Sequence, residues 1–335
     1  MNEEQNEEFT IVRKIGEGTF STVFLAEDAE TKRSVAIKQL TKTVSPTRVA
    51  TELTFLRELK GEKNVIELIS ASRKNDDMFI VFPYVEGSDF KEFILTRTVA
   101  DIKHYMFELL TALQHVHAQD IIHRDIKPGN FLYDARQKKG YLIDFGLSQR
   151  AEKKVEEVVE KKRRFFFSSQ SVSKNNRASM PRPPPGYAIR DSRPPMAASR
   201  SGTRGFRAPE VLLRVDAQTT AIDVWSAGVI LLSLLTRKYP FFSSKDDINA
   251  IVELGSIFGD KEMRGAAKHY KRIWKSNIKE CLAEKMTFKE VTLMCSGKEE
   301  DLPAALFDLL EKMLALKANE RITAEEALRH KFFIQ

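Results

Sequence analysis

The 335-residue sequence is poor in cysteine and has no long apolar run. Its two cysteines, Cys281 and Cys295, form no CxxC pair, which argues against a disulfide framework or a structural zinc site and favours a reducing compartment. The longest apolar stretch, residues 224–235, is shorter than the roughly 20 residues that cross a bilayer, so we expect no membrane-spanning segment. The first ten residues, MNEEQNEEFT, are acidic and lack the apolar core of a secretory signal.

The formal net charge of +7 is concentrated in one segment. Residues 150–204 contain 14 Lys and Arg against 5 Asp and Glu, whereas the rest of the chain has 40 basic and 42 acidic residues. Residues 151–200 are rich in Pro, Ser and Arg without apolar periodicity, a composition that buries too little surface to offset the entropy of ordering. We expect a largely flexible insert, in which the aromatic run Phe165–Phe167 is a candidate docking contact.

Periodicity divides the chain into a β-rich part and a helical part. Alternating apolar residues predict strands at 9–15, 22–27, 34–39, 65–70 and 78–84, with a helix at 51–59 among them. After residue 90 the spacing predicts helices at 102–117, 223–236, 248–258 and 306–316. We therefore expect an α+β fold of two lobes. A small antiparallel β-rich lobe with one helix covers residues 1–85, and a larger, mainly helical lobe covers residues 86–335.

A phosphate-binding signal lies on the first predicted hairpin. Residues 16–23, GEGTFSTV, fit GxGxxSxV, in which small residues let backbone N–H groups approach phosphate oxygens closely. The positions that carry the pattern are Gly16, Gly18, Ser21 and Val23. Glycine-rich turns are common, so the pattern alone is weak. A strand rather than a helix follows it, which disfavours a dinucleotide-binding fold.

The strand VAIK ends in Lys38, 15 residues after Val23. A lysine at the end of an apolar strand is often a solvated edge charge. Downstream of a glycine loop, however, Lys38 is placed to neutralise α and β phosphates, and it then needs an anion to hold it in position. Glu52, on the packing face of the helix predicted at 51–59, is the first candidate and Glu58 is the second.

Two further stretches concentrate polar chemistry in predicted loops. In HRDIKPGN, Asp125 is placed to accept a hydroxyl proton, Lys127 to offset charge on a phosphoryl group and Asn130 to bind a metal. Asp144, 14 residues after Asn130, opens the sequence DFG, where its carboxylate is placed to chelate a Mg²⁺ that bridges phosphates. Four such motifs in this order and spacing leave little room for coincidence.

With these motifs the sequence resembles the protein kinase superfamily over nearly its whole length. The resemblance implies ATP and Mg²⁺ as cofactors and an adenine site formed by Ala36, the gatekeeper Phe82 and the backbone of Pro83 and Val85. Further matches are APE at 208–210, DVWS at 223–226 and NERIT at 319–323. They imply that Glu210 pairs with a buried Arg321 and that Asp223 braces the catalytic loop, while His123, Phe145 and Leu56 are packing residues.

Two features refine the expected substrate. Lys127 together with Thr203 resembles the serine/threonine pattern, in which Thr203 bridges Asp125 and Lys127. Arg204 stands where many kinases have proline, and Arg207 follows three residues later. These cations are expected beside the position that binds the substrate residue following the phosphorylated serine or threonine. They would favour an acidic or phosphorylated residue there, so we expect Thr203, Arg204 and Arg207 to bind substrate. A solvated arginine is the alternative for Arg204.

The closer resemblance is to the cell-division-cycle-seven kinases, on HRDIKPGNFLYD, GYLIDFGLSQR, GTRGFRAPEVLL and QTTAIDVWSAGVILLSLLTRKYPFF. It implies a nuclear cell-cycle serine/threonine kinase that depends on a Dbf-four-type regulatory subunit and phosphorylates minichromosome maintenance helicase subunits to trigger DNA replication. The insert between Asp144 and Ala208 fits that family. The arginine at 204, the short chain and an insert without cysteine depart from what the family leads us to expect.

Alternatives remain for the insert and for the whole chain. The insert is a docking site for the regulatory subunit, a weak DNA contact or nuclear import signal through Lys161–Arg164, or a solvated linker. The chain as a whole is alternatively an autonomous acidophilic casein-kinase-like enzyme or, as a non-enzyme, a pseudokinase scaffold. A nucleic-acid-binding module built on the insert would show steeply salt-dependent binding.

Overall fold

The computed structural model describes residues 8–18, 21–41, 43–74, 77–151, 201–297 and 300–334. Apart from Ala151, the insert expected at 151–200 lies outside the described residues, and so do the aromatic run Phe165–Phe167 and the basic run Lys161–Arg164. Among the described residues, no helix combines the length and the apolar character needed to span a membrane.

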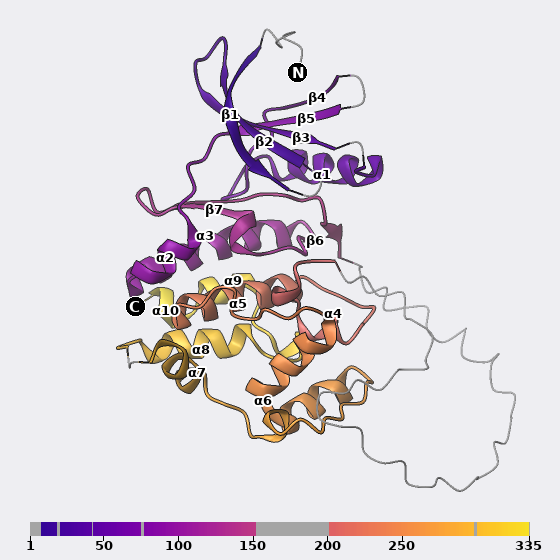
Figure 1. The fold of residues 1–335 in the computed structure, drawn as a ribbon, viewed down its shortest axis with the longest axis vertical. Helices are drawn as coiled ribbons and strands as arrows, with labels where there is room; N and C mark the ends of the chain where they lie inside the picture. Colours follow the sequence, from indigo (N-terminus) through magenta and orange to yellow (C-terminus); the bar gives the residue numbers. More distant parts are fainter. Residues whose placement is uncertain are drawn as a thin grey trace, which may run out of the picture.

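The N-terminal part is one antiparallel sheet in the order β1-β2-β3-β5-β4 with a single helix beside it (Figure 1). The strands are β1 Phe9–Glu17, β2 Ser21–Asp28, β3 Ser34–Leu40, β4 Ser70–Lys74 and β5 Asp77–Pro83. Helix α1, Pro46–Leu59, packs on the sheet through Leu53, which joins Leu40 and Ile80 in an apolar cluster. Proline suits the first helical position because its fixed φ is helical and its missing N–H would have no partner there.

The C-terminal part is mainly helical (Figure 1). Its helices are α2 Phe90–Thr96, α3 Val99–Ala118, α4 Pro209–Leu212, α5 Ala221–Thr236, α6 Asp247–His269, α7 Phe288–Ser296, α8 Ala304–Met313, α9 Ala324–Leu328 and α10 Lys331–Ile334. Two short antiparallel pairs join β6 Ile121–Ile122 to β9 Gln149–Arg150 and β7 Phe131–Asp134 to β8 Lys139–Leu142. Capping boxes at Thr98, Thr287 and Thr323 start α3, α7 and α9 by satisfying backbone N–H groups that the helix itself leaves free.

Helix α5 forms the centre of this part. Every residue from Ile222 to Thr236 is buried, as expected for a helix that is apolar around its whole circumference. Gly228 permits close packing, since a Cβ there would lie only 2.8 Å from Cδ2 of Leu314. The helix is therefore rigidly packed, and residues that form hydrogen bonds with it are held in defined positions.

The predicted α+β class is confirmed, but the strand predicted at 65–70 is wrong. Strand β4 begins at Ser70, and Val65 makes only an isolated bridge with Leu142. Val65 and Ile66 belong to the large core cluster, where they are 0% and 2% exposed. Burial in this core, and not a place in the sheet, accounts for the apolar run. The amide of Ile66 donates to the carbonyl of Leu142, so this segment runs beside β8 rather than in the sheet.

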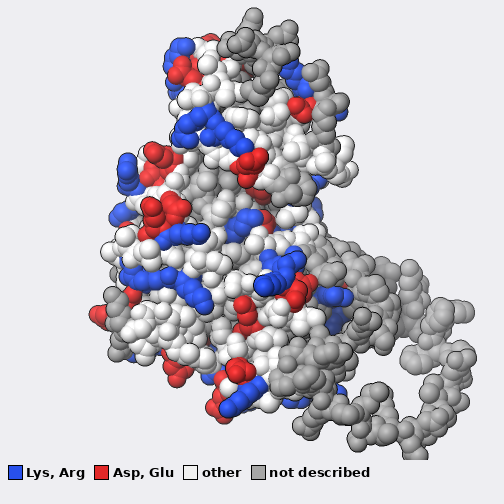
Figure 2. Space-filling view, in the orientation of Figure 1, with Lys and Arg blue, Asp and Glu red and all other residues white. Residues whose placement is uncertain are grey.

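Surface charges of both signs are interspersed on the face drawn in Figure 2. The described residues there show no large area of one sign, which agrees with the near balance of basic and acidic residues outside 150–204.

A buried ion pair ties residues 209–212 to the C-terminal elements. Nη1 and Nη2 of Arg321 donate to Oε1 and Oε2 of Glu210 at 2.7 and 3.0 Å, and the two side chains are 0% and 1% exposed. Nη1 also donates to the carbonyl of Ala221 at the start of α5, and the guanidinium lies 5.2 Å from the ring centre of Trp225. The expected Arg321–Glu210 pair is confirmed.

Removing the Arg321 guanidinium would leave the Glu210 carboxylate buried without its partner. We expect Arg321→Met to lower the free energy of unfolding by about 3–5 kcal/mol, measured by urea denaturation. Arg329→Met is the matched control, because Arg329 pairs with Glu325 on the surface, where the side chains are 73% and 54% exposed. Equal losses in the two variants would contradict a special role for the buried pair.

Candidate active site

A cleft of about 620 Å³ lies between the sheet and the helical part. The predicted nucleotide-binding residues that line it are Gly16, Ser21, Val23, Ala36, Lys38, Phe82, Pro83 and Val85. Gly18 is not part of the lining; its N–H donates to the carbonyl of Ser21 at 2.8 Å and so closes the turn between β1 and β2. Apolar residues from separate segments also line the walls: Ile15, Ile66, Leu132 and Ile143.

Strand register explains why the predicted residues meet. Lys38 on β3 is paired with Val23 on β2, and Ala36 with Phe82 on β5. Directly paired residues share a face of an antiparallel sheet, and Ala36 and Lys38 are two residues apart. The side chains of Val23, Ala36, Lys38 and Phe82 therefore lie on the face of the sheet that lines the cleft.

Lys38 lies between two carboxylates. Its Nζ is 2.7 Å from Oε1 of Glu52 and 3.2 Å from Oδ1 of Asp144, and its side chain is only 14% exposed. The first candidate, Glu52, is thus the partner, whereas Glu58 pairs with Arg150. Burial lowers the pKa of Lys38, but the two carboxylates outweigh it and the pKa is raised. Burial likewise raises the pKa of Asp144, and Lys38 reverses the shift and lowers it.

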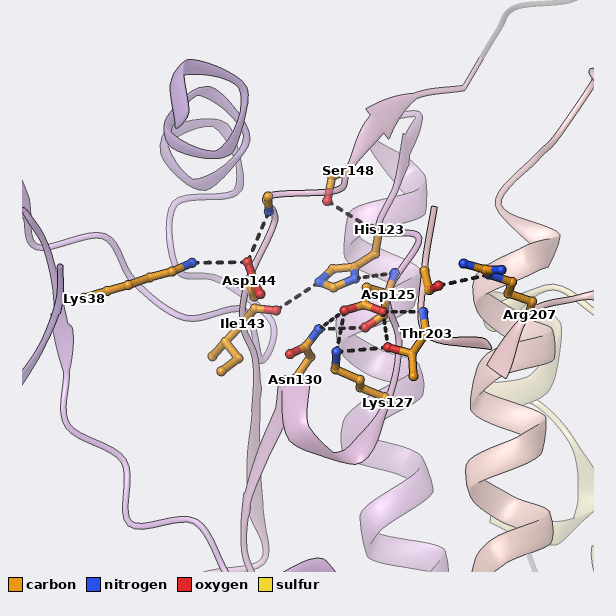
Figure 3. Close-up of polar contacts among 12 residues, drawn as sticks. Lys38, His123, Asp125, Lys127, Asn130, Ile143, Asp144, Ser148, Thr203 and Arg207 are labelled. Atoms are coloured by element: carbon orange, nitrogen blue, oxygen red, sulfur yellow. Dashed lines mark hydrogen bonds and ion pairs between the residues drawn. The ribbon is translucent and has the colours of Figure 1, made fainter. Parts of the chain in front are cut away.

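The loop at 123–130 holds a compact polar cluster (Figure 3). Nζ of Lys127 donates to Oδ2 of Asp125 at 2.7 Å and to Oγ1 of Thr203 at 3.0 Å. The backbone N–H and the hydroxyl of Thr203 both donate to Oδ1 of Asp125 at 2.8 Å. The expected bridge by Thr203 between Asp125 and Lys127 is present.

The cluster keeps Asp125 ionised. Burial raises the pKa of its carboxyl group, but the Lys127 ammonium and the donors of Thr203 outweigh this, so the pKa is lowered. Oδ1 accepts from the backbone N–H and the hydroxyl of Thr203, and Oδ2 accepts from Lys127 and Asn130, so the about four lone-pair sites of the carboxylate are all engaged and a further donor would take the place of one of these four.

Asp223 fixes the backbone of this loop to α5. Its Oδ2 and Oδ1 accept from the amides of His123 and Arg124, each at 2.8 Å, and His117 contacts Oδ2 at 3.0 Å. Arg124 and Asp144 have φ of 72° and 64°, a left-handed conformation that is uncommon outside glycine. Such strain is retained where surrounding contacts hold it, and it clusters at functional sites.

Asn130 and Asp144 provide oxygens to the same cleft. Nδ2 of Asn130 donates to the carbonyl and to Oδ2 of Asp125 at 2.8 and 2.9 Å, so the amide oxygen is the atom left for a cation. In the described part of the chain, no three or more His, Cys, Asp and Glu side chains gather into a metal site. Two hard oxygen ligands fit Mg²⁺, which keeps several waters and takes phosphate oxygens to complete its shell.

The three predicted substrate-binding residues differ in their surroundings. Thr203 joins the Asp125 cluster, while Arg204 is exposed and bonds to the carbonyl of Lys245. Arg207 is half-buried, and its Nη1 donates to Oδ1 of Asp247 at 2.6 Å. Its Nε donates to the carbonyl of Gly202 at 3.0 Å (Figure 3). Much of the Arg207 charge is therefore already balanced, and Arg204 is the more available cation.

Sequence reasoning missed other residues of the cleft. Asp89 lines it and caps α2, its carboxylate accepting from the amides of Lys91 and Glu92 at 2.7 and 3.0 Å. An aspartate directly before an apolar run is a signal for such a cap. Tyr239 also lines the cleft, with its ring 5.0 Å from that of Phe90, but no spacing links residues so far apart in the sequence.

Comparison with known proteins places these features in a family. Residues 9–180 and 186–333 match the family described as Protein kinase domain. A probable cell division control protein 7 homologue of Encephalitozoon cuniculi is 49% identical over 325 residues, which cover 97% of this chain and 92% of that protein. In Schizosaccharomyces pombe the cell cycle protein kinase spo4 is 38% identical, covering 98% of this chain and 85% of its own length. The cell cycle serine/threonine-protein kinase hsk1 of the same yeast is 36% identical, with 98% and 73% covered.

The chain belongs to the protein kinase family, as a serine/threonine kinase similar to the cell division control protein 7 kinases. The expected bilobal α+β fold and ATP-dependent protein kinase activity are confirmed. Members of this family use ATP with a divalent cation.

The Thr203 hydroxyl should help to set the pKa of Asp125. Thr203→Val keeps the backbone N–H donor but removes the hydroxyl, so we expect the pKa of Asp125 to rise, measured by carboxyl ¹³C NMR titration. Because the pKa of Asp125 is lowered in the folded state, its ionised carboxylate stabilises the fold at pH values above the unfolded-state pKa. This stabilisation is lost as the pH falls through the folded-state pKa. In Thr203→Val the folded-state pKa lies closer to the unfolded-state pKa, so the loss of stability due to Asp125 on acidification should be smaller and should be complete at a higher pH. Thr203→Ser keeps the hydroxyl and should titrate like the parent; identical titration of all three proteins would contradict the account.

Proposed function

We propose that Asp125 is the catalytic carboxylate of serine/threonine phosphorylation and that Lys127, Lys38 and Glu52 complete the catalytic set. The carrying observation is the polar cluster beside Asn130, a residue that lines the cleft, in which Asp125 accepts from both Lys127 and Thr203. In it, Asp125 accepts a hydrogen bond from the substrate hydroxyl and takes its proton as the oxygen bonds to phosphorus. Since its pKa is lowered, orientation of the hydroxyl is its larger contribution.

The remaining polar residues act on charge. Lys127 offsets negative charge on the phosphoryl group near Asp125, and Lys38 binds phosphate oxygens while Glu52 keeps its side chain extended. We assign nucleotide binding to Gly16, Gly18, Ser21, Val23, Ala36, Phe82, Pro83 and Val85 together with Lys38. Asp144 and Asn130 hold Mg²⁺, which when bound neutralises charge on the phosphates. The hinge after Val85 then separates an N-lobe, residues 1–85, from a C-lobe, residues 86–335.

Replacing the carboxylate tests the catalytic assignment. We expect Asp125→Asn to lower the rate of phosphate transfer from Mg-ATP to a serine peptide by about 10²–10⁴-fold, the range typical of a positioned acid or base. Binding of ATP, measured by calorimetry, should stay close to that of the parent because Asp125 is not placed on the nucleotide. Transfer by Asp125→Asn at the parental rate would exclude this residue as the catalytic group.

We further propose that Arg204 and Arg207 frame the site for the residue after the acceptor and favour an acidic or phosphorylated side chain there. Thr203 bonds to Asp125, so its neighbour Arg204 lies one residue from the reacting position. Its guanidinium is exposed, and within the described residues it donates to the neutral carbonyl of Lys245, so its charge is available to a carboxylate or phosphate. Arg207, paired with Asp247, orients this segment more than it supplies charge.

The biological setting we propose follows from the family. The chain acts in the nucleus on minichromosome maintenance helicase subunits, with a Dbf-four-type regulatory subunit, to trigger DNA replication. The Lys38–Glu52 pair is already formed without a partner, so we propose that the subunit stabilises this arrangement rather than creates it. Residues 151–200 dock the subunit, with weak DNA contact through their basic residues as an addition.

Paired peptides test both proposals in one assay. With the regulatory subunit present, we expect a Ser-Asp peptide to be phosphorylated with kcat/KM about tenfold above a Ser-Ala peptide. Arg204→Ala should remove the preference, and Arg204→Lys, which keeps the charge, should retain part of it. The chain alone should transfer phosphate slowly.

Other outcomes of that assay would contradict parts of the proposal. Vigorous transfer by the chain alone would favour an autonomous, casein-kinase-like enzyme. A preference that survives Arg204→Ala would leave Arg204 as a solvated arginine.

A further inference from the structure

Arg48 occupies a position that helix stability does not explain. It lies in the first turn of α1, four residues before Glu52, so the two side chains project from the same face of the helix. A cation near a helix N-terminus is opposed by the helix dipole. The turn has no acidic residue to offset it, and the N-cap residue Ser45 makes no side-chain capping bond. A residue that breaks a local rule in this way is a candidate for a functional role.

The Arg48 side chain crosses from α1 to the segment that follows Asp144. Its Nε donates to the carbonyl oxygen of Gly146 at 2.6 Å. A Cβ built on Gly146 would lie 3.3 Å from Arg48 Nε, 3.3 Å from Glu52 Oε2 and 3.2 Å from Asp144 Oδ1. Gly146 is therefore the point at which the two side chains from α1 meet the carboxylate of Asp144.

The backbone at Asp144 needs support from outside. Its φ of 64° is unfavourable for a residue with a side chain and persists only where neighbouring contacts hold it. The bond within the turn, from Gly146 N to Asp144 Oδ1, is long at 3.4 Å and so contributes little. The short, charge-assisted bond from Arg48 to the Gly146 carbonyl is a stronger restraint on the same turn.

Contacts at the C-terminal end of α1 also connect this helix to the C-terminal part. Arg150 on β9 pairs with Glu58 in the last turn of α1, donates to the carbonyl of Gln119 at 2.6 Å and lies over the ring of Phe55. The helix is thus tied to the C-terminal part near both ends, by Arg48 and by Glu58. A displacement of α1 would pull on the Gly146 carbonyl and turn the Asp144 carboxylate away from its place beside Lys38.

We propose that Arg48 is a positioning residue that couples the location of α1 to the metal-binding carboxylate of Asp144 through the carbonyl of Gly146. The inference rests on the metal-binding role proposed above for Asp144 and Asn130. It predicts that Arg48 sets the affinity for Mg²⁺ at the nucleotide without itself touching metal or nucleotide.

Metal-linked nucleotide binding tests the coupling without relying on turnover. The dissociation constant of ADP is measured by calorimetry on the full chain with Mg²⁺ and with EDTA, and the ratio of the two constants gives the metal-linked gain in affinity. We expect Arg48→Gln to reduce this gain by about tenfold, as for other residues that orient metal ligands, while ADP affinity in EDTA stays unchanged. Arg48→Lys, which keeps a cation able to reach the carbonyl, should restore most of the gain.

The matched control is Arg57→Gln, which removes an arginine from the exposed face of the same helix and should keep the full gain. An unchanged gain in Arg48→Gln, with the gain lost in Asp144→Asn, would overturn the coupling and leave the proposed metal site standing. A gain that survives Asp144→Asn would overturn the metal role itself. Equal weakening of ADP binding with and without metal in Arg48→Gln would also overturn the inference, because it would indicate a general structural effect.

Discussion

The buried charge of Lys38 is the constraint on which the rest of the site depends. Its ammonium group is removed from most of the solvent and balanced by Glu52 from α1 and Asp144 from the C-terminal part. A buried charge that loses a partner destabilises a protein strongly, so the sheet, α1 and the segment after β8 must stay together. The sheet and the segment after β8 both line the cleft, and α1 supplies Glu52 to the lysine that lies between them. A phosphate group entering the cleft meets a cation whose position is already determined, and little reorganisation is needed.

The catalytic loop depends on a second buried carboxylate. Asp223 belongs to the buried helix α5 and accepts from the amides of His123 and Arg124, which positions the next residue, Asp125. The left-handed conformation of Arg124 is held in this way, and Nη1 of Arg124 donates to the buried Gln218 at 2.8 Å. The core of the C-terminal part thus reaches the reacting position through a short series of backbone bonds. Precise placement of the hydroxyl acceptor follows from packing of α5, not from the loop alone.

Local pattern predicted the parts of the site whose residues are near one another in the sequence. Asp125, Lys127 and Asn130 share one loop, and the place of Glu52 on the packing face of α1 distinguishes it from Glu58. The strand predicted at 65–70 is wrong because a short apolar run has the same pattern whether it forms a strand of a sheet or packs on a core. The contact of Arg48 with Gly146 joins positions 98 residues apart, and no periodicity carries that information. The pairing of Arg207 with Asp247 was missed for the same reason, and it changes which arginine is available to substrate.

A crystal structure of the chain with Mg²⁺ and a non-hydrolysable ATP analogue tests the central claim most directly, namely that Lys38, Asp144 and Asn130 form one preassembled site for metal and phosphate. The account predicts Mg²⁺ bound by the carboxylate of Asp144 and the amide oxygen of Asn130, and Lys38 in contact with phosphate oxygens while still paired with Glu52. Metal bound away from these two residues, or phosphates that leave Lys38 without contact, would contradict it.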